Sequence, residues 1–439
     1  MAEKIRVRFA PSPTGKVHIG NIRAAIYNWL YARHTGGKFL LRVEDTDLER
    51  STPEAIAALM DCMKWLGLDY DEEPFYQTKN VARHLECVEK LISIGRAYKI
   101  EKTSRDGKTG VVTMFRMPKE GVIEFDDIVK GHMAKKAEDI QDFAIVRSDG
   151  SPIFHIANVV DDIDQGVSHI IRGDDHVENT FKHIEIFKAL GAPIPKYAHL
   201  SMIVNQQGKP YSKRDGAAFV GEFKEQGYLP EALFNYLLLL GWNPGDEREV
   251  LTKDEMVSLF GLEKVHVTAA KFDLKKLAWM NGEYIKRMPK DEFISQLLKR
   301  VEVAGMSVPD GFDVSYLAEQ LQVRTKFLND IPSLCKCFFS DDFEMDPKAV
   351  EKRLKKEGVK ELLLDLVERF SRSSSWTAEA LESLVKELSQ GNGMGPWVHP
   401  IRVAVSGKGE GIGLFEMLQL LGREKTLERL ASAAEKYAL

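Results

Sequence analysis

The segment from Arg8 to Asn21 (RFAPSPTGKVHIGN) combines residue types that can bind an anion. It follows a short β-prone run at residues 5–10 and precedes a helical pattern at residues 19–34. A helix N-terminus presents unpaired N–H groups and the positive end of the helix dipole. His18 can donate a hydrogen bond to a phosphate oxygen, and Gly20 leaves room for a ligand beside the backbone. A lone histidine is more often structural, but this context favours a phosphate site.

A second segment, Gly208 to Gly216 (GKPYSKRDG), carries three cations in a polar loop. Lys209, Lys213 and Arg214 suit a reaction in which negative charge grows on a phosphoryl group. No Walker-type glycine run precedes the segment, which excludes a P-loop. The alternative interpretation is a solvated turn without a catalytic role.

The elements that must position these segments are typical of an α/β chain. Apolar runs at residues 5–10 and 39–43 flank the helical pattern, which predicts a βαβ unit and a parallel sheet. Further helices are predicted at 53–66 and 81–95, a polar α+β insertion at 99–142, strands at 143–146 and 167–171, and helices over most of 293–439. The fold class is therefore a doubly wound, Rossmann-like domain with an α+β insertion, followed by an all-helical C-terminal region.

We expect three parts with defined limits. Residues 1–80 and 170–292 form the Rossmann-like domain, residues 81–169 the inserted module and residues 293–439 the helical region, with a possible division near 360. The length of 439 residues agrees with about three domains.

The composition is that of an ordinary globular protein, with 44% hydrophobic and 29% charged residues. It excludes disordered, collagen-like and disulfide-rich classes. The net charge of −5 hides strong local differences. Residues 41–73 hold three basic and ten acidic side chains, a net −7. Residues 348–360 hold six basic and two acidic ones, a net +4, which indicates a solvated helix face or a contact with RNA phosphates.

The four cysteines do not form a metal-binding pattern. Cys335 and Cys337 have no second pair and no histidine cluster beside them in the sequence, so we expect no zinc and no other protein-bound metal. The first thirteen residues lack the apolar core of a secretory signal, and residues 233–242 are too short to span a membrane. We therefore expect a cytoplasmic protein that does not interact with membranes.

Together, the segments from Arg8 to Asn21 and from Gly208 to Gly216 closely resemble the signature motifs of class I aminoacyl-tRNA synthetases. More narrowly, the chain resembles bacterial-type glutamyl-tRNA synthetases. The motifs that carry the resemblance are Arg8-x-Ala-Pro-Ser-Pro-Thr-Gly, His18-Ile-Gly-Asn, Arg42-Val-Glu-Asp-Thr-Asp47, Trp65-Leu-Gly-Leu, Ala157-Asn-Val-Val-Asp-Asp162, Ile171-Arg-Gly-Asp-Asp-His176, Ser212-Lys-Arg, Gly227-Tyr-Leu-Pro-Glu-Ala-Leu, Trp279-Met-Asn-Gly-Glu-Tyr-Ile285 and Pro400-Ile-Arg-Val-Ala-Val-Ser-Gly407. They occur in matching order over nearly the whole chain.

The resemblance implies ATP-dependent ligation of L-glutamate to tRNA-Glu through glutamyl-adenylate, with release of pyrophosphate and AMP. It implies Mg²⁺ with the ATP, an anticodon-binding role for the helical region and a monomeric state. Catalytic residues would be His18, Lys213 and Arg214. ATP would be bound by His18, Gly20, Lys209, Ser212 and Lys213; glutamate by Arg8, Ala10, Ser12, Glu44, Phe154, Asn158 and Arg172; and tRNA by Asp47, Arg50, Arg324 and Lys326. The two arginines of the glutamate pocket would bind its carboxylates, and Glu44 its ammonium group.

Three departures from the family pattern bear on these assignments. Phe154 stands where a tyrosine is usual, which removes a phenol donor. Pro210 stands where the second signature usually has a lysine, so that Lys209, one place earlier, is the candidate substitute. The insertion is short and lacks the cysteine-rich piece that binds zinc in some members, which agrees with the absence of zinc that we expect.

The sequence leaves alternatives open. A non-discriminating enzyme would also charge tRNA-Gln with glutamate, and an inactive paralogue would only bind tRNA. Phe154 and Pro210 are the only support for the inactive paralogue. A glutaminyl-tRNA synthetase is disfavoured by Arg8, and a tRNA-modifying glutamyl transferase by the helical C-terminal region.

Overall fold

The computed structural model describes residues 4–47, 51–103, 109–389 and 393–438. It forms two compact units, each of which is described by itself below. The first unit runs to Glu225 and resumes over Leu229–Met280. The second unit consists of Gln226–Tyr228 and the chain from Asn281 onward. The sequence analysis instead placed the start of the helical region at residue 293, and that boundary stays a prediction.

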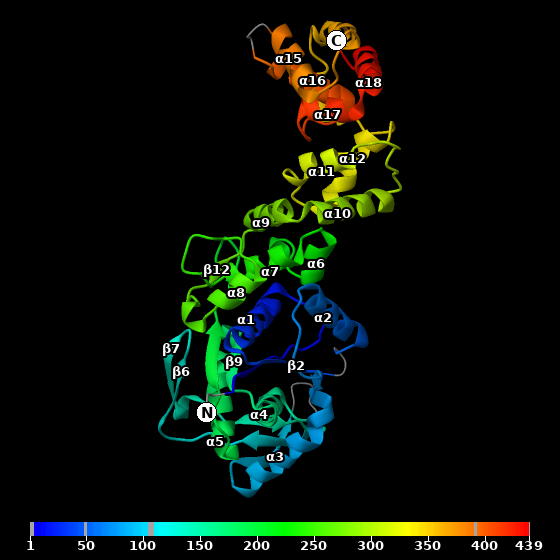
Figure 1. The fold of residues 1–439 in the computed structure, drawn as a ribbon. Helices are drawn as coiled ribbons and strands as arrows, with labels where there is room; N and C mark the ends of the chain where they lie inside the picture. Colours follow the sequence, from blue (N-terminus) through cyan, green and yellow to red (C-terminus); the bar gives the residue numbers. More distant parts are fainter. Residues whose placement is uncertain (1–3, 48–50, 104–108, 390–392, 439) are drawn as a thin grey trace. The chain divides into compact units, whose positions relative to one another are not determined.

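The first sheet of unit one contains the predicted βαβ unit. Strands β1 (Arg6–Phe9), β2 (Lys38–Val43) and β3 (Phe75–Tyr76) pair in parallel in that order. Helix α1 (Ile19–Thr35) joins β1 to β2 and packs against both strands (Figure 1). Its apolar residues are almost fully buried, as a helix that covers a parallel sheet requires. The carboxyl end of β1 therefore leads directly into the loop that precedes α1.

The second sheet contains strands from both the Rossmann-like part and the insertion. Strands β9 (His169–Gly173) and β10 (Lys196–Leu200) are parallel, and α5 (Val177–Leu190) connects them. On the other side of β10 lies β6 (Val122–Asp127), which forms a hairpin with β7 (Gly131–Lys136). A hydrogen bond of 2.9 Å from the Ser168 amide to the Arg6 carbonyl places β9 beside β1. The inserted module is thus continuous with the sheet that supports the site.

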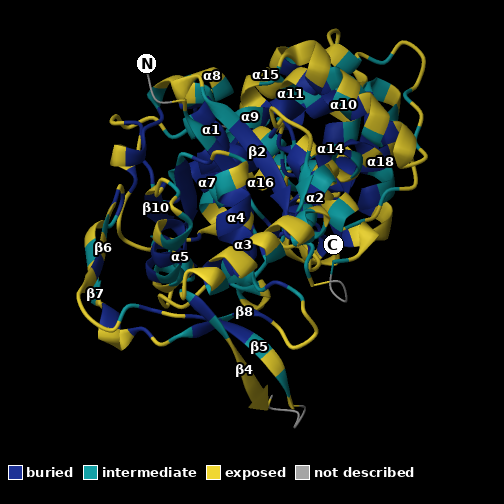
Figure 2. Cartoon of the chain, turned by 90° about the horizontal axis from the view of Figure 1, so that it is seen from below, coloured by how far each residue is buried: buried dark blue, intermediate teal, exposed yellow. Residues whose placement is uncertain are grey.

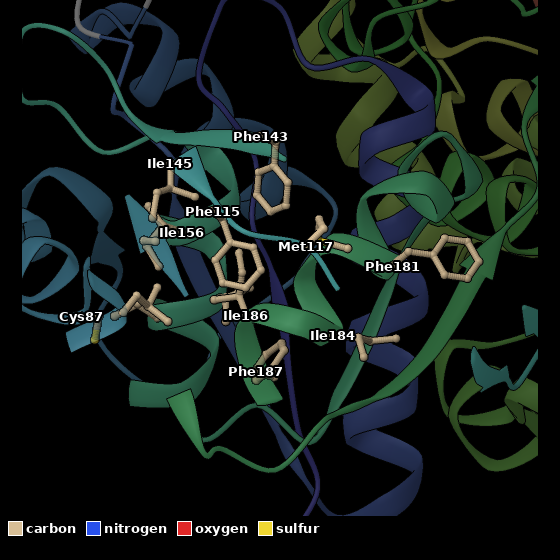
Figure 3. Close-up of a cluster of buried hydrophobic side chains, with 14 of the residues drawn as sticks. Cys87, Phe115, Met117, Phe143, Ile145, Ile156, Phe181, Ile184, Ile186 and Phe187 are labelled. Atoms are coloured by element: carbon tan, nitrogen blue, oxygen red, sulfur yellow. The ribbon is translucent and has the colours of Figure 1, made fainter. Parts of the chain in front are cut away.

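An antiparallel sheet forms the remainder of the insertion. It consists of β4 (Ala97–Thr103), β5 (Thr109–Phe115) and β8 (Phe143–Val146), in that order. Helices α3 (Val81–Ser93) and α4 (Phe154–Asp164) pack beside it, and their apolar side chains share one core with the sheet and α5 (Figure 3). Beyond this core, most of β4 is exposed (Figure 2). The module is therefore anchored at its base through Phe115, Ile145, Ile156 and Phe187.

The other elements of unit one complete the surroundings of the site. They are α2 (Pro53–Trp65), β11 (Ile203–Val204), α6 (Val220–Glu225), α7 (Pro230–Leu239), α8 (Lys253–Leu259) and β12 (Ala270–Lys271). Helix α9 (Leu274–Arg287) contains the boundary between the two units. Among these, β11 pairs in parallel with β12, and α7 packs against α1.

The regular elements of unit two in its described residues are helices joined by loops. Its helices are α10 (Lys290–Val303), α11 (Val314–Gln322), α12 (Ile331–Phe339), α13 (Pro347–Arg353), α14 (Val359–Ser371), α15 (Ala378–Leu388), α16 (Gly395–Ser406), α17 (Leu414–Leu421) and α18 (Arg423–Lys436). The predicted fold class, a Rossmann-like α/β domain with an insertion followed by a helical region, is confirmed. The basic run 348–360 does not lie on a single helix, because α13 ends at Arg353 and α14 begins at Val359. The sequence interpretation of one helix face is therefore wrong.

Candidate functional site

A cavity of about 430 Å³ lies at the carboxyl ends of β1, β9 and β10. The carboxyl edge of a parallel sheet is where α/β folds bind nucleotides and their co-substrates. Most of the residues predicted to bind glutamate or ATP line this cavity: Arg8, Ala10, Ser12, His18, Gly20, Glu44, Phe154, Asn158 and Arg172. They come from parts of the sequence more than 160 positions apart, and the fold brings them together.

His18 occupies the N-cap position of α1. Its Nδ1 accepts a hydrogen bond of 3.0 Å from the Gly20 amide. Nδ1 must therefore be unprotonated, so the neutral ring carries its hydrogen on Nε2. Burial lowers the pKa of His18, which favours this neutral form. A hydrogen bond between the ring and the Tyr211 backbone opposes this shift, so the ring would have to exchange that contact to donate to a phosphate oxygen beside the helix N-terminus.

The second basic segment begins at the cavity but directs its cations to solvent. Pro210 and Tyr211 line the cavity, whereas Lys209, Lys213 and Arg214 are exposed and lie outside its lining. Ser212 and Asp215 form a capping box around a single 3-10 turn, and Asn205 donates a hydrogen bond of 2.8 Å to Asp215. The loop thus presents three unburied cations at the cavity rim.

The two signature segments are also joined through the backbone. The Ile19 amide donates to the Ala218 carbonyl at 3.0 Å, and the Val220 amide donates to the Val17 carbonyl at 3.0 Å. The rings of His18 and Phe219 meet edge to face. The start of α1 is consequently fixed relative to the chain that follows the basic loop.

A buried cluster of four charged groups forms the floor beside β1 and β2. Arg8 donates to Asp162 with its Nε at 2.9 Å and its Nη2 at 3.4 Å. Arg42 donates to the same carboxylate at 2.6 Å, and its Nη2 lies 3.5 Å from Glu44. Two guanidinium groups and two carboxylates balance in charge. Although burial opposes ionisation, Arg42 and Arg8 hold the pKa of Asp162 below its usual value.

Glu44 and Asn158 provide acceptor atoms on one side of the cavity. Asn158 donates to Glu44 at 2.6 Å, while the Asn158 Oδ1 has no hydrogen-bond partner among the described residues. Both side chains are more than 90% buried. Burial raises the pKa of Glu44, and the nearby Arg42 and Arg8 act in the opposite direction. A bound ammonium group would stabilise the charged carboxylate and accept contacts from both residues.

Arg172 differs from Arg8 and Arg42 because the described residues give it no carboxylate partner. Its side chain, which is 8% exposed, is held by three uncharged acceptors. They are His199 Nε2 at 3.3 Å, the His176 carbonyl at 3.3 Å and Thr180 Oγ1 at 2.7 Å. Burial lowers the pKa of Arg172 to about 10, so the guanidinium is charged at neutral pH. Arg23 also lines the cavity and is buried, and among the described residues it donates only to the Leu240 and Ser201 carbonyls. The cavity therefore contains two arginines, Arg23 and Arg172, without a carboxylate partner among the described residues.

Phe154 begins α4 and lines the cavity, and its side chain has no polar atom. Its ring lies 5.6–5.7 Å from the rings of His155, His176 and His183. His155 and His183 are 3.2 Å apart between Nδ1 and Nε2. The usual tyrosine hydroxyl is absent, which leaves an apolar face on this side of the cavity.

We predict that Phe154→Tyr lowers the KM for glutamate about fivefold to thirtyfold, because one added hydrogen bond to a charged group contributes about 1–2 kcal/mol. Steady-state charging kinetics at saturating ATP would measure it, and Phe154→Leu is the control that changes packing without adding a donor. An unchanged KM in Phe154→Tyr would show that the site does not need this phenol.

The histidines around Phe154 predict a loss of stability in mild acid. Burial, together with Lys182 and Arg172, lowers the pKa of His155 to about 4, and burial also lowers the pKa values of His176 and His183. The unfolded chain takes up protons near the ordinary value of 6.5, whereas the folded chain resists protonation. This contribution to stability is therefore fully present above pH 6.5 and is lost as the pH falls toward 4.

We expect the contribution of His155 to the free energy of unfolding to fall by about 1–2 kcal/mol between pH 7 and pH 5, and those of His176 and His183 to fall in the same direction. Urea unfolding at several pH values would measure this fall, with His155→Gln as the matched variant. The variant should show a shallower pH dependence than the wild-type chain. Parallel curves for the two proteins would contradict the assignment to His155.

Of the predicted tRNA contacts, those that the structure describes do not line the cavity. Asp47 is exposed at the end of the segment after β2, and Arg50 lies outside the described residues. Arg324 and Lys326 are exposed in unit two, where Arg324 donates to the Gly411 carbonyl at 3.2 Å. Their roles stay predictions.

The described residues contain no group of three histidine, cysteine or acidic side chains arranged to hold a metal ion. Cys335 and Cys337 are buried in α12, and burial raises the pKa of Cys337 to about 11. In the described part of the chain, none of the helices is both long and apolar enough to cross a membrane.

The sequence analysis gave no roles to several residues that shape the site. Asp162 and Arg42 lie inside quoted motifs, but only the structure shows that they form one charge cluster with Arg8. Thr180 and His199 hold Arg172 and had no recognisable spacing signal. Contacts of this kind depend on strand register, which a single sequence does not reveal.

Comparison with known proteins places this geometry in context. Residues 4–109 and 100–279 match the family model described as tRNA synthetases class I (E and Q), catalytic domain. Residues 273–434 match the anticodon binding domain model. Glutamate–tRNA ligases from Francisella philomiragia and Francisella tularensis subsp. novicida are each 39% identical, over 98% of this chain and 99% of the relative.

Solved structures agree with the sequence comparison. The crystal structure of a glutamate tRNA ligase from Elizabethkingia meningosepticum, in complex with its amino acid, has a TM-score of 0.87 at 28% identity and covers 99% of this chain and 100% of that chain. The glutamate-tRNA synthetase of Elizabethkingia anophelis has a TM-score of 0.86 at 29% identity, with the same coverage.

Proposed function

This chain belongs to the class I tRNA synthetases of the glutamate and glutamine group, and on that premise we propose that it ligates L-glutamate to tRNA-Glu at the expense of ATP. The glutamate carboxylate attacks the α-phosphate of ATP, which gives glutamyl-adenylate and releases pyrophosphate. A hydroxyl of the terminal tRNA ribose then attacks the activated carbonyl and loses its proton, and AMP leaves.

One observation carries the choice of substrate. Arg172 is buried beside the cavity with its charge unmatched, next to a cluster of Arg8, Arg42, Asp162 and Glu44 that is balanced. Glutamate carries two carboxylates and one ammonium group, a net charge of −1, so it would supply the carboxylate partner that Arg172 lacks. Glutamine would leave a buried guanidinium facing a neutral amide, which costs several kcal/mol.

The roles of the individual residues follow from their positions. Arg8 and Arg172 bind the carboxylates of glutamate, and Glu44 with Asn158 binds its ammonium group. Ala10 and Ser12 line the side of the cavity next to β1, and Phe154 supplies an apolar face. His18 and the backbone at Gly20 bind ATP phosphates at the N-terminus of α1. The α-carboxylate of the substrate is thereby oriented toward the ATP site, while the side-chain carboxylate stays bound for recognition.

The basic loop supplies charge stabilisation. Lys213 and Arg214 stabilise the α-phosphate as pyrophosphate leaves, with Ser212 and Lys209 as further phosphate ligands. These cations are exposed in the structure, which allows them to approach the phosphates when ATP occupies the cavity. Mg²⁺ enters with ATP and neutralises phosphate charge.

Each part of the chain has its own role in the proposed reaction. Residues 1–80 and 170–292 carry the chemistry, residues 81–169 contact the acceptor stem, and residues 293–439 bind the anticodon, with the basic run 348–360 toward RNA phosphates. Asp47, Arg50, Arg324 and Lys326 contact tRNA. A monomeric state and a cytoplasmic location are part of the same proposal.

The test is a charging assay with purified protein, Mg²⁺-ATP, labelled glutamate and separate transcripts of tRNA-Glu, tRNA-Gln and tRNA-Asp. Charging of tRNA-Glu is the expected result, with tRNA-Asp as the negative control. If none of the three transcripts is charged, the proposed activity is refuted. Charging of tRNA-Gln would widen the tRNA specificity without changing the chemistry.

A further inference from the structure

A buried chain of hydrogen bonds connects Arg172 to the inserted module. It begins at Asp127, the last residue of β6, which is 3% exposed. Oδ2 of Asp127 lies 2.6 Å from Nδ1 of His199, and both of its carboxylate oxygens accept from the His199 amide, at 3.2 and 3.1 Å. His199 lies on β10 directly opposite Arg172 in the parallel register with β9. The insertion thus reaches the residue beside Arg172.

The contact with Asp127 determines which nitrogen of His199 carries the hydrogen. Although burial disfavours its charge, His199 and neighbouring backbone amides hold the pKa of Asp127 below its usual value, and burial lowers the pKa of His199. An ionised carboxylate only accepts hydrogen bonds, so Nδ1 of His199 must be the donor. Nε2 then has a free lone pair directed away from Asp127.

This lone pair faces the guanidinium. Nε2 of His199 accepts from Nε of Arg172 at 3.3 Å and lies 3.0 Å from Oγ1 of Thr180. Oγ1 of Thr180 in turn accepts from Nη2 of Arg172 at 2.7 Å. The Tyr197 ring lies parallel to the His199 ring, with 5° between the planes and 5.9 Å between the ring centroids. Arg172 is thereby oriented by neutral groups, whereas Arg8 is held by the carboxylate of Asp162.

We propose that Asp127, His199 and Thr180 are positioning residues for glutamate recognition, which orient Arg172 through uncharged acceptors and so leave its charge available to a substrate carboxylate. This inference rests on the proposed function. A direct carboxylate partner would orient Arg172 equally well, but it would compete with glutamate for the same charge. The neutral acceptors orient Arg172 without competing with glutamate for its charge. Asp127 fixes the tautomer of His199 but is not itself an acceptor of Arg172.

The sharpest test is a matched pair of substitutions at Thr180. Thr180→Val has nearly the same shape but lacks the acceptor, and it should raise the KM for glutamate about tenfold, as expected for a lost hydrogen bond to a charged group. Thr180→Ser retains the hydroxyl and should restore the KM to within about twofold of the wild-type value, given the same acceptor. The KM for ATP should stay constant in both variants, because Arg172 does not contact ATP in the proposed site.

A second variant tests the tautomer. In Asp127→Asn, the amide oxygen is expected to remain at the position of Oδ1, which accepts from the amides of Val129, Lys130 and His199. The amide NH₂ then faces Nδ1 of His199, so Nε2 acquires the hydrogen and confronts Arg172 donor to donor. We expect a KM increase for glutamate of about tenfold, at unchanged KM for ATP.

The outcomes separate this inference from the proposed function. If wild-type protein charges tRNA-Glu but Thr180→Val leaves the KM for glutamate unchanged, the positioning role is refuted while the function stands. Equal KM increases in Thr180→Val and Thr180→Ser would also refute it, because the hydroxyl would not be the cause. If the wild-type chain charges none of the transcripts, the proposed function itself fails.

Discussion

Replacement of Arg172 by methionine should lower kcat/KM for glutamate about 100- to 1,000-fold, which corresponds to about 3–4 kcal/mol. Methionine keeps much of the side-chain volume and removes a buried charge that has no carboxylate partner among the described residues. The loss should appear mainly in the KM for glutamate, because the contact exists before the chemical step as well as during it. Charging kinetics with varied glutamate at saturating ATP would measure it.

Arg172→Lys is the matched control for this experiment. It retains a positive charge but lacks the planar fork that engages a carboxylate through two parallel hydrogen bonds. We expect it to recover part of the loss, about tenfold relative to Arg172→Met. If Arg172→Met binds glutamate with a KM within twofold of the wild-type value, then the unmatched charge does not bind the substrate.

Replacement of Lys213 by alanine should slow adenylate formation about 100- to 1,000-fold, the range found when a donor to a developing negative charge is removed. The expected defect lies in kcat, because the contact strengthens as charge moves onto the leaving pyrophosphate. ATP–pyrophosphate exchange in the presence of tRNA-Glu would measure this step without the later transfer.

Lys209→Ala provides the comparison for Lys213→Ala. Both lysines are exposed on the same loop, so their solvent exposure is matched. Lys209 precedes Pro210, whose restricted φ fixes the chain where a lysine is usual in the family. We expect a loss of less than about tenfold, as for a peripheral phosphate contact. Equal losses in both variants would show that Lys209 has taken over the role of the missing lysine.

The sequence predicted those parts of the fold that depend on local patterns. The strand–loop–helix around Arg8 to Asn21 was confirmed, since apolar runs and helical spacing determine a βαβ unit without long-range information. The run 348–360 was less predictable, because Gly358 lies between its two helices with a positive φ. A charge count alone does not detect such a break.

The candidate site was also predicted only in part. Arg8, Glu44, Asn158 and Arg172 were predicted through the family resemblance, and the fold brings all four to one cavity. Their partners were not predicted. The contact between Asp127 and His199 requires β6 to pair with β10, and neither strand contains a signal for that pairing. Whether a buried charge is matched or unmatched also depends on such contacts, so the charge balance of the cavity emerges only from the structure.

Discrimination between glutamate and glutamine tests the central claim most directly, because both fit a cavity of this size and differ chiefly in charge. Wild-type protein, Mg²⁺-ATP and a tRNA-Glu transcript would be incubated with each labelled amino acid in turn, and kcat/KM compared. An unmatched buried arginine predicts a preference for glutamate of about 1,000-fold or more. A preference below about tenfold would contradict the account, since a site that tolerates the neutral amide cannot rely on the charge of Arg172.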